Sequence, residues 1–252
     1  MTTHYRTFGF VLKKTDRGEF DQSFSVFTRD FGKLEITAKA IRKIKSKLRA
    51  GIDIFYFSEI EFIQGKNQKT LTDAIAVEKF VDIRRNLGGL GTARKIAQAL
   101  DGMVRGQEKD QRIYNLLEEV FNKLNDCAAA SDAQILPEPF SVPTKLEIIY
   151  YYFVWNLFSI LGYQINLYDC ALCQKKLSPQ YLFFNPEEGG IICDACFLRA
   201  GKGERISPDI VKIVRLLAEK NWKIARRLKV EESQRELLEM ISENYLSRYI
   251  NK

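Results

Sequence analysis

The sequence predicts an α+β protein with more than one domain: a small barrel, then a helical region interrupted by a four-cysteine module. Three observations support this. Short segments with period-two apolar spacing fill residues 5 to about 80, helical spacing follows, and two Cys-x2-Cys pairs interrupt the helical pattern. We expect a barrel domain over 1–80, a helical domain over 81–167 and 201–252, and the inserted module over 168–200.

Branched and aromatic residues in a period-two pattern predict five strands in the N-terminal region. A turn signal at Asp30-Phe31-Gly32-Lys33 separates two of them. The expected strands cover residues 5–12, 23–28, 34–38, 52–63 and 69–75. Because closure removes exposed strand edges, five short strands predict a small closed barrel. An SH3-like barrel is the alternative on the pattern alone.

Beyond the barrel, apolar residues recur every three or four positions, as in helices packed on one face. The expected helices cover residues 92–104, 111–129, 144–161, 210–218, 222–228 and 233–250. Glycines 88–91 are interpreted as a helix break, and prolines between 137 and 143 mark another. Ser207-Pro208 is typical of a helix start. The apolar run 148–162 is too short to span a bilayer and predicts a buried helix.

The four cysteines form two pairs on either side of a short predicted hairpin. They are Cys170, Cys173, Cys193 and Cys196. This spacing lets four thiolates close a tetrahedron around a Zn²⁺ ion. Since no ligand position then stays open for water or substrate, the predicted zinc is structural rather than catalytic. Thiols without a metal, or disulfides in an oxidising compartment, are the alternatives.

A net charge of +7 and a pI of about 9.1 favour a polyanionic partner, with nucleic acid before an anionic membrane. Residues 39–49, between two predicted strands, hold six basic residues and no acidic one. We expect these side chains to contact phosphates: Lys39, Arg42, Lys43, Lys45, Lys47 and Arg49. A solvated basic loop is the alternative. A second basic set, from Arg199 to Lys229, follows the cysteine module, and its role is open.

Two runs of residues resemble the bacterial RecO family of recombination mediators. The first is T-R-D-F-G-K over residues 28–33 followed by Ala38-Lys39-Ala40, where Ala40 replaces the usual glycine. The second, more specific run joins L-G-Y over 161–163, the first cysteine pair, F-F-N-P-E-E-G-G over 183–190 and Cys193. The likeness covers nearly the whole chain, although the middle helices and the last 45 residues match only in general pattern.

This resemblance implies an oligonucleotide-binding (OB) barrel that binds single- and double-stranded DNA, and a protein that anneals complementary strands without enzymatic activity. Such proteins act with RecR to help load RecA onto DNA coated by single-strand-binding protein, and some contact that protein's acidic C-terminal tail. Many relatives lack the cysteines, which agrees with a structural role for zinc. The N-terminus lacks the apolar core of a signal peptide, and we expect a cytoplasmic, nucleoid-associated protein.

Two other classes are weighed against this interpretation. The first is a zinc-stapled transcription or RNA-binding factor, which would bind nucleic acid without annealing it. The second is a metal-dependent nuclease or hydrolase, which would need a histidine or carboxylate cluster at an open metal site. The single histidine, His4, lies far from the cysteines in sequence, and the chain has no Gly-x4-Gly-Lys-Ser/Thr phosphate loop.

Overall fold

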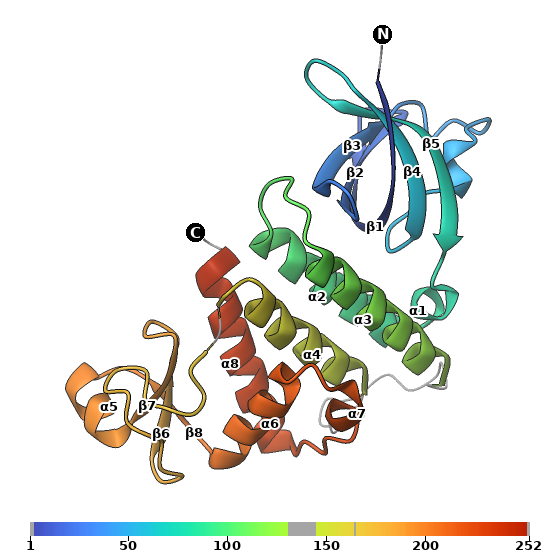
Figure 1. Ribbon diagram of the computed structural model, residues 1–252. Coiled ribbons are helices and arrows are strands. Elements are labelled where there is room, and N and C mark those ends of the chain that lie inside the picture. Colours follow the sequence, from blue (N-terminus) through green and yellow to red (C-terminus); the bar gives the residue numbers. More distant parts are fainter. Residues whose placement is uncertain (1–2, 131–144, 164, 251–252) are drawn as a thin grey trace. The chain divides into compact units, whose positions relative to one another are not determined.

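A computed structural model describes residues 3–130, 145–163 and 165–250 (Figure 1). The chain forms two compact units, Met1–Ser131 and Asp132–Lys252. The three-part domain division expected from the sequence remains a prediction, because compactness alone does not show which segments fold independently. The expected proline break at 137–143 lies outside the described residues.

The first unit begins with a closed five-stranded barrel (Figure 1). Its strands are β1 (His4–Arg17), β2 (Asp21–Thr28), β3 (Gly32–Ala38), β4 (Phe57–Gln64) and β5 (Lys69–Glu78). β1 pairs antiparallel with both β2 and β4, and β3 closes the barrel by pairing parallel with β5. The resulting order, β1-β2-β3-β5-β4, is that of an OB-type barrel, so the predicted barrel is confirmed and the SH3-like alternative is excluded.

The inward face of the barrel follows the predicted alternation. Leu34, Ile36 and Ala38 on β3 are all buried, as are Phe24 and Val26 on β2. Successive strand residues point to opposite faces, so these side chains meet inside the barrel. On β2 and β3 the apolar core therefore comes from residues two positions apart.

The predicted strand over 52–63 is wrong in its first five residues, since β4 begins at Phe57. Ile52 and Phe55 are both buried, which strict alternation forbids. Phe55 has a left-handed φ of 63°, and its N–H donates to the Val11 carbonyl of β1. A Cβ on Gly51 would lie 1.8 Å from the Ala74 carbonyl oxygen, so this backbone packs directly on β5. Residues 51–56 are an irregular segment that helps fill the barrel.

Three helices complete the first unit: α1 (Val81–Arg85), α2 (Leu87–Met103) and α3 (Gln111–Ala130). The glycines at 88–91 lie inside α2, so their interpretation as a helix break is wrong. Asn86 caps α2 by accepting a hydrogen bond from the Gly89 N–H. A Cβ on Gly89 would lie 3.3 Å from the Ile83 Cα, and the glycine thereby lets α1 and α2 pack closely.

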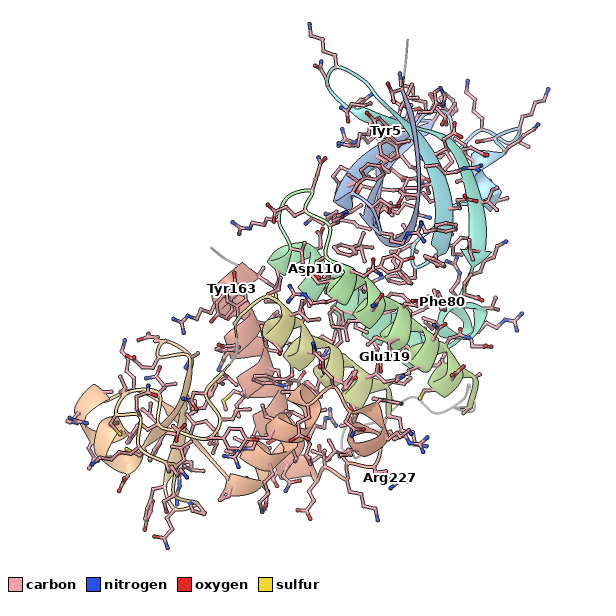
Figure 2. All side chains as sticks on the ribbon, in the orientation of Figure 1. Tyr5, Phe80, Asp110, Glu119, Tyr163 and Arg227 are labelled. Carbon is pink, nitrogen blue, oxygen red and sulfur yellow. The ribbon has the colours of Figure 1, made fainter. Side chains whose placement is uncertain are left out.

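An aromatic cluster joins the barrel to these helices. Phe10 of β1 lies within 6.4 Å of Phe80, 5.7 Å of Tyr114 and 5.5 Å of Phe121, measured between ring centroids. Figure 2 shows Phe80 where the chain leaves the barrel for α1, whereas Tyr5 lies within the barrel. Phe10 and Phe121 are fully buried. The barrel and α3 therefore share a core.

Outside the cysteine module, the described part of the second unit holds four helices. The helices are α4 (Lys145–Ile160), α6 (Pro208–Ala218), α7 (Trp222–Ala225) and α8 (Glu232–Ile250). Nearly every residue of α4 is buried, as its apolar run predicts. Ser207 caps α6 by accepting a hydrogen bond from the Ile210 N–H, which confirms the predicted helix start. In the described part of the chain, no helix is long and apolar enough to cross a membrane.

The cysteine module interrupts this helical unit. It contains β6 (Leu182–Asn185), β7 (Gly190–Cys193), α5 (Asp194–Ala200) and β8 (Glu204–Ile206), with the sheet order β7-β6-β8. The hairpin β6–β7 is the predicted one, with the Pro186–Gly189 turn between its strands. Helix α5 and strand β8 have no counterpart in the sequence-based prediction.

Replacing Phe121 with Ala should test the shared core of barrel and helices. We expect the free energy of unfolding to fall by about 3–5 kcal/mol, because the change leaves a cavity among buried rings. Urea unfolding of the full chain followed by circular dichroism measures this. Leu87→Ala, at a position 75% exposed, is the control and should have little effect. A decrease no larger than that of the control would contradict a joint core.

Candidate nucleic-acid interface and metal centre

The basic loop, defined as residues 39–49, lies in the connection from β3 to β4, which also contains a short 3₁₀ helix (Leu48–Ala50). All six of its basic side chains are exposed. Ile41 is 1% exposed and packs into the barrel core, and Leu48 packs partly against the same core. These two anchors hold the loop on the barrel while its cations face solvent. Residues 39–49 thus lie between two strands, as the sequence predicts.

The turn between β1 and β2 supports the basic loop. The Ala40 N–H donates to the Asp21 carboxylate over 2.7 Å, and the Arg42 N–H donates to the Phe20 carbonyl over 3.0 Å. The Lys43 ammonium lies 5.1 Å from the centroid of the Phe20 ring. Ala40 has a left-handed φ of 53°, a conformation that glycine adopts without strain. The loop and the turn thus form one continuous surface.

The charge of this surface is largely uncompensated. Arg42 pairs with Asp16 over 3.5 Å. Among the residues that the structure describes, Lys39, Lys43, Lys45, Lys47 and Arg49 form no ion pair within 4.0 Å. Like charges this close repel one another, and a bound polyanion would relieve that repulsion. The geometry therefore suits phosphate contact, although the role of these six residues in DNA binding remains a prediction.

A polar hollow of about 350 Å³ lies beside the basic loop. Its lining includes Arg42 and Arg49 of the loop together with Lys14 and Asp53. The Asp53 carboxylate accepts hydrogen bonds from Lys14 over 2.5 Å and from Arg84 over 3.0 Å. Partial burial opposes its ionisation, but Lys14, the Ile54 N–H and Arg84 together hold the pKa of Asp53 below its ordinary value. Two cations thus offset this one acid, and the loop's own cations stay available.

The second basic set differs from the basic loop, because several of its residues form ion pairs or hydrogen bonds within the protein. Arg215 donates to the Leu167 carbonyl and lies 4.1 Å from the Tyr168 ring centroid. Lys202 pairs with Glu187 over 3.2 Å, and Lys212 pairs with Asp209 over 3.1 Å. This set is therefore not one uncompensated surface.

The four cysteine sulfurs gather in the second unit. All four Sγ atoms lie within 4.8 Å of one another, and those of Cys173 and Cys193 are 3.9 Å apart. Zinc–sulfur bonds of about 2.3 Å in a tetrahedron place sulfurs roughly 3.8 Å apart, so the cluster fits such an ion. All four are free thiols, since a disulfide would need a sulfur separation of about 2.05 Å. The cluster can hold a metal ion.

Local structure prepares these sulfurs for a cation. The Cys193 N–H donates to the Cys170 sulfur over 3.4 Å, and Arg199 donates to the Cys196 sulfur over 3.1 Å. Burial opposes ionisation of Cys170, but hydrogen bonds from backbone N–H groups outweigh it and lower its pKa to about 6. Burial together with the neighbouring thiols raises the pKa of Cys193 to about 11. All four sulfurs can therefore ionise together only when a cation lies among them.

Two aromatic rings and two arginines position the module. Phe183 of β6 and Phe197 of α5 stack with centroids 3.8 Å apart, and both pack against the cysteine cluster. Arg248 of α8 donates to the Pro186 carbonyl in the hairpin turn, and Arg215 of α6 holds the segment before Cys170 through Leu167. The sulfur positions thus depend on packing contacts that the cysteine spacing does not reveal.

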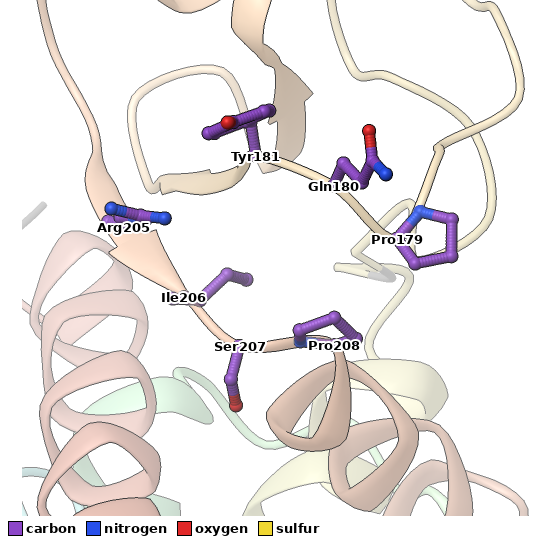
Figure 3. Close-up of a pocket in the computed structure, with 7 residues that line it drawn as sticks. All are labelled: Pro179, Gln180, Tyr181, Arg205, Ile206, Ser207 and Pro208. Atoms are coloured by element: carbon purple, nitrogen blue, oxygen red, sulfur yellow. The ribbon is translucent and has the colours of Figure 1, made fainter.

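A separate hollow of about 540 Å³ lies where β8 leads into α6 (Figure 3). Tyr181 and Arg205 line it on one side, with 5.6 Å between the guanidinium carbon and the ring centroid, and Pro179 and Pro208 line it elsewhere. Of the described residues that line this hollow, Arg205 is the one cation and none is a cysteine.

Comparison with known proteins gives one consistent result. Residues 1–80 match the family "Recombination protein O N terminal", and residues 141–252 match "Recombination protein O C terminal". The chain is 29% identical to a DNA repair protein RecO of Dehalococcoides mccartyi, over 90% of this chain and 83% of that protein. It is also 29% identical to one of Moorella thermoacetica, over 97% and 85%, and 25% identical to one of Alkaliphilus metalliredigens, over 98% and 94%.

The Asp53 cluster predicts a pH-dependent contribution to stability. The pKa of Asp53 is below its ordinary value of 3.8, so its ion pairs stabilise the fold at neutral pH, and this stabilisation disappears as the pH falls through the lowered pKa. Asp53→Asn should therefore unfold at a lower temperature than the parent at pH 7, with the difference shrinking below about pH 4.

Thermal unfolding midpoints of both proteins across this pH range measure the effect. Asp16→Asn, at a side chain 59% exposed, is the control and should change the midpoint little at any pH. A difference for Asp53→Asn that stays constant down to the lowest pH would contradict the role of the carboxylate charge.

Proposed function

Since the chain belongs to the RecO family of DNA repair proteins, we propose that it is a non-enzymatic DNA-binding recombination mediator. It binds single- and double-stranded DNA and anneals complementary strands. With RecR it helps load RecA onto DNA coated by single-strand-binding protein, whose C-terminal tail it contacts. The observation that carries the DNA-binding part is the exposed, six-cation basic loop on an OB-type barrel.

The mechanism follows from electrostatics. Cations of the basic loop neutralise phosphates and release condensed counterions, which drives binding without regard to sequence. Two complementary strands held on such a surface repel each other less, and they pair faster. Because no bond is broken in this process, it needs no nucleotide hydrolysis and no catalytic residue. The protein would act in the cytoplasm, at the nucleoid.

For the second unit we propose a structural zinc ion held by Cys170, Cys173, Cys193 and Cys196. When bound, the ion would link the segment that carries Cys170 and Cys173 to the end of β7 and to α5, which carry Cys193 and Cys196. The N–H groups and Arg199 that contact these sulfurs stabilise the thiolate forms. With four sulfur ligands, the site leaves no position for a substrate, which supports a stabilising role rather than catalysis.

A zinc-stapled transcription or RNA-binding factor is the alternative function. The three-stranded sheet with its four cysteines would serve such a protein equally well. Strand annealing distinguishes the two, because a transcription or RNA-binding factor would bind nucleic acid without accelerating the pairing of complementary DNA strands.

The DNA-binding proposal predicts a change in salt dependence. Replacing Lys39, Arg42, Lys43 and Lys45 together with Ala should weaken binding across DNA sequences and slow annealing. The slope of log affinity against log salt should flatten by roughly 0.7 for each single-strand phosphate that the variant no longer neutralises. Fluorescence anisotropy and an annealing assay without ATP, both over a salt series, measure these effects.

A variant with the same change of charge elsewhere provides the control. Lys66, Lys109, Lys220 and Lys223 are exposed, and their joint replacement with Ala should leave the slope nearly unchanged. An unaltered slope in the loop variant would place the DNA site elsewhere. DNA incubated with the parent protein and Mg²⁺ should stay intact, and time-dependent cleavage would contradict the non-enzymatic proposal.

The zinc proposal predicts one zinc ion per chain, measured by elemental analysis. Cys173→Ser should lose that ion and lower the unfolding temperature, while DNA binding by the barrel is retained in part. Cys127→Ser is the matched control, because Cys127 lies on α3 outside the cluster, and its zinc content should be normal. If Cys173→Ser keeps both its metal and its stability, zinc is not bound as proposed.

A further inference from the structure

Two apolar side chains stand exposed amid the cations of the basic loop. Of the loop's apolar residues, Ile41 and Leu48 pack against the barrel, but Ile44 is 98% exposed between Lys43 and Lys45. Phe20, in the β1–β2 turn, is 42% exposed. A single exposed apolar residue on a protein surface is common and needs no explanation. Here, however, two of them belong to one basic surface.

Backbone hydrogen bonds fix this pair in place. The Arg42 N–H donates to the Phe20 carbonyl over 3.0 Å, which ties the turn to the loop. Within the loop, the Lys43 N–H donates to the Ala40 carbonyl, and the Ser46 N–H donates to the Lys43 carbonyl. These bonds form the turns that carry Ile44. These contacts are made by backbone groups. The positions of Phe20 and Ile44 are therefore set by the fold of the turn and the loop.

Lys43 covers Phe20 in the free protein. Its ammonium lies 5.1 Å from the ring centroid, and it has no ion pair among the described residues. A phosphate group is a stronger partner for an ammonium than an exposed ring is. When a nucleic-acid strand approaches, Lys43 can therefore exchange the ring for a phosphate, and the face of Phe20 becomes free.

We propose that Phe20 and Ile44 contact unpaired bases of single-stranded DNA while the basic loop holds the phosphates. This inference rests on the proposed function and assigns the residues that meet the bases. A base stacks on the freed ring of Phe20, and Ile44 packs against a neighbouring base. An aromatic ring beside a track of cations is the arrangement by which proteins bind single strands without sequence preference.

Charge and geometry favour single-stranded DNA over other anionic partners. In a duplex the bases face inward, so apolar side chains at the level of the phosphates could not reach their faces. An acidic peptide would offer carboxylates, but it has no flat apolar faces to stack on an aromatic ring. A base stacked on Phe20 is also separated from its neighbour in the strand, with its pairing edge open to a complementary strand. The pair would thereby assist annealing.

The test combines protein variants with altered DNA. Binding of the full-length protein is measured by anisotropy to a labelled oligothymidine of about 15 nucleotides and to a strand of equal length in which abasic residues replace the thymidines. The abasic strand keeps the phosphates and lacks the bases. Phe20→Ala and Ile44→Ser should each bind oligothymidine about tenfold more weakly than the parent, yet bind the abasic strand equally well. Their salt slopes should match that of the parent, because every cation that meets a phosphate is still present.

Leu87→Ser, at an exposed apolar position in α2 outside this surface, is the control and should behave as the parent does. Since Ile44 is almost fully exposed, its replacement leaves the fold intact, and this variant tests the inference even if Phe20→Ala is unstable.

The two proposals can fail separately. If both variants bind oligothymidine as tightly as the parent does, the inference is wrong, even if their affinity for an acidic peptide has changed. The proposed DNA-binding function would still stand. An equal weakening on both strands would also overturn it, since the side chains would then only shape the loop. If the parent protein binds neither strand, the proposed function itself fails.

Discussion

Closure of the barrel by the pairing of β3 with β5 is the constraint on which the first unit depends. Only two residue pairs make this junction, Ile36 with Lys69 and Thr37 with Thr70, and they place β5 between β3 and β4. The chain that leaves β3 therefore cannot form a tight hairpin with β4, the next strand in the sequence. It must travel from residue 39 to residue 56 before β4 begins. That long connection is where the basic loop lies, so the topology of the barrel creates the surface that we assign to DNA.

The same connection also contributes apolar side chains to the core of the barrel. Ile41 and Ile52 pack into the barrel core, whereas the cations between them face solvent. Phe55 is also buried, with its ring centroid 6.3 Å from that of Phe121 on α3. Phe55 reaches its place through a left-handed backbone and a hydrogen bond to Val11. The apolar residues supply the burial that stabilises an otherwise irregular segment. The basic ones are the residues that we propose to contact DNA. Within this one connection, the buried apolar residues thus stabilise the fold, and the exposed basic residues are the proposed DNA contacts.

Most of this architecture can be predicted from the sequence, and the failures have physical causes. The cysteine spacing correctly predicts that the four sulfurs meet, because a metal site requires a fixed spacing of its ligands. Strand alternation is also informative, because successive side chains of a strand point to opposite faces. Ile52, Ile54 and Tyr56 also alternate, but the left-handed turn at Phe55 breaks the strand, and no apolar period reveals it. The glycines at 88–91 suggest a helix break, yet a side chain outside the run, that of Asn86, caps the helix that contains them. The sequence does not reveal that Phe20 and Asp53 lie at the basic surface, because they come near it only when β1, β2 and the loop are folded together.

The two candidate sites share one physical principle, which is incomplete compensation of charge by the protein itself. On the barrel, Lys14 and Arg84 satisfy Asp53, and Asp16 satisfies Arg42, but the remaining cations of the basic loop have no acidic partner among the described residues. In the cysteine module, N–H donors and Arg199 favour thiolates, yet four sulfurs within 4.8 Å repel one another as anions. Each arrangement is less stable alone than with a ligand of opposite charge. The unpaired cations on the barrel support the polyanionic ligand that we propose, and the four clustered sulfurs support the proposed zinc ion.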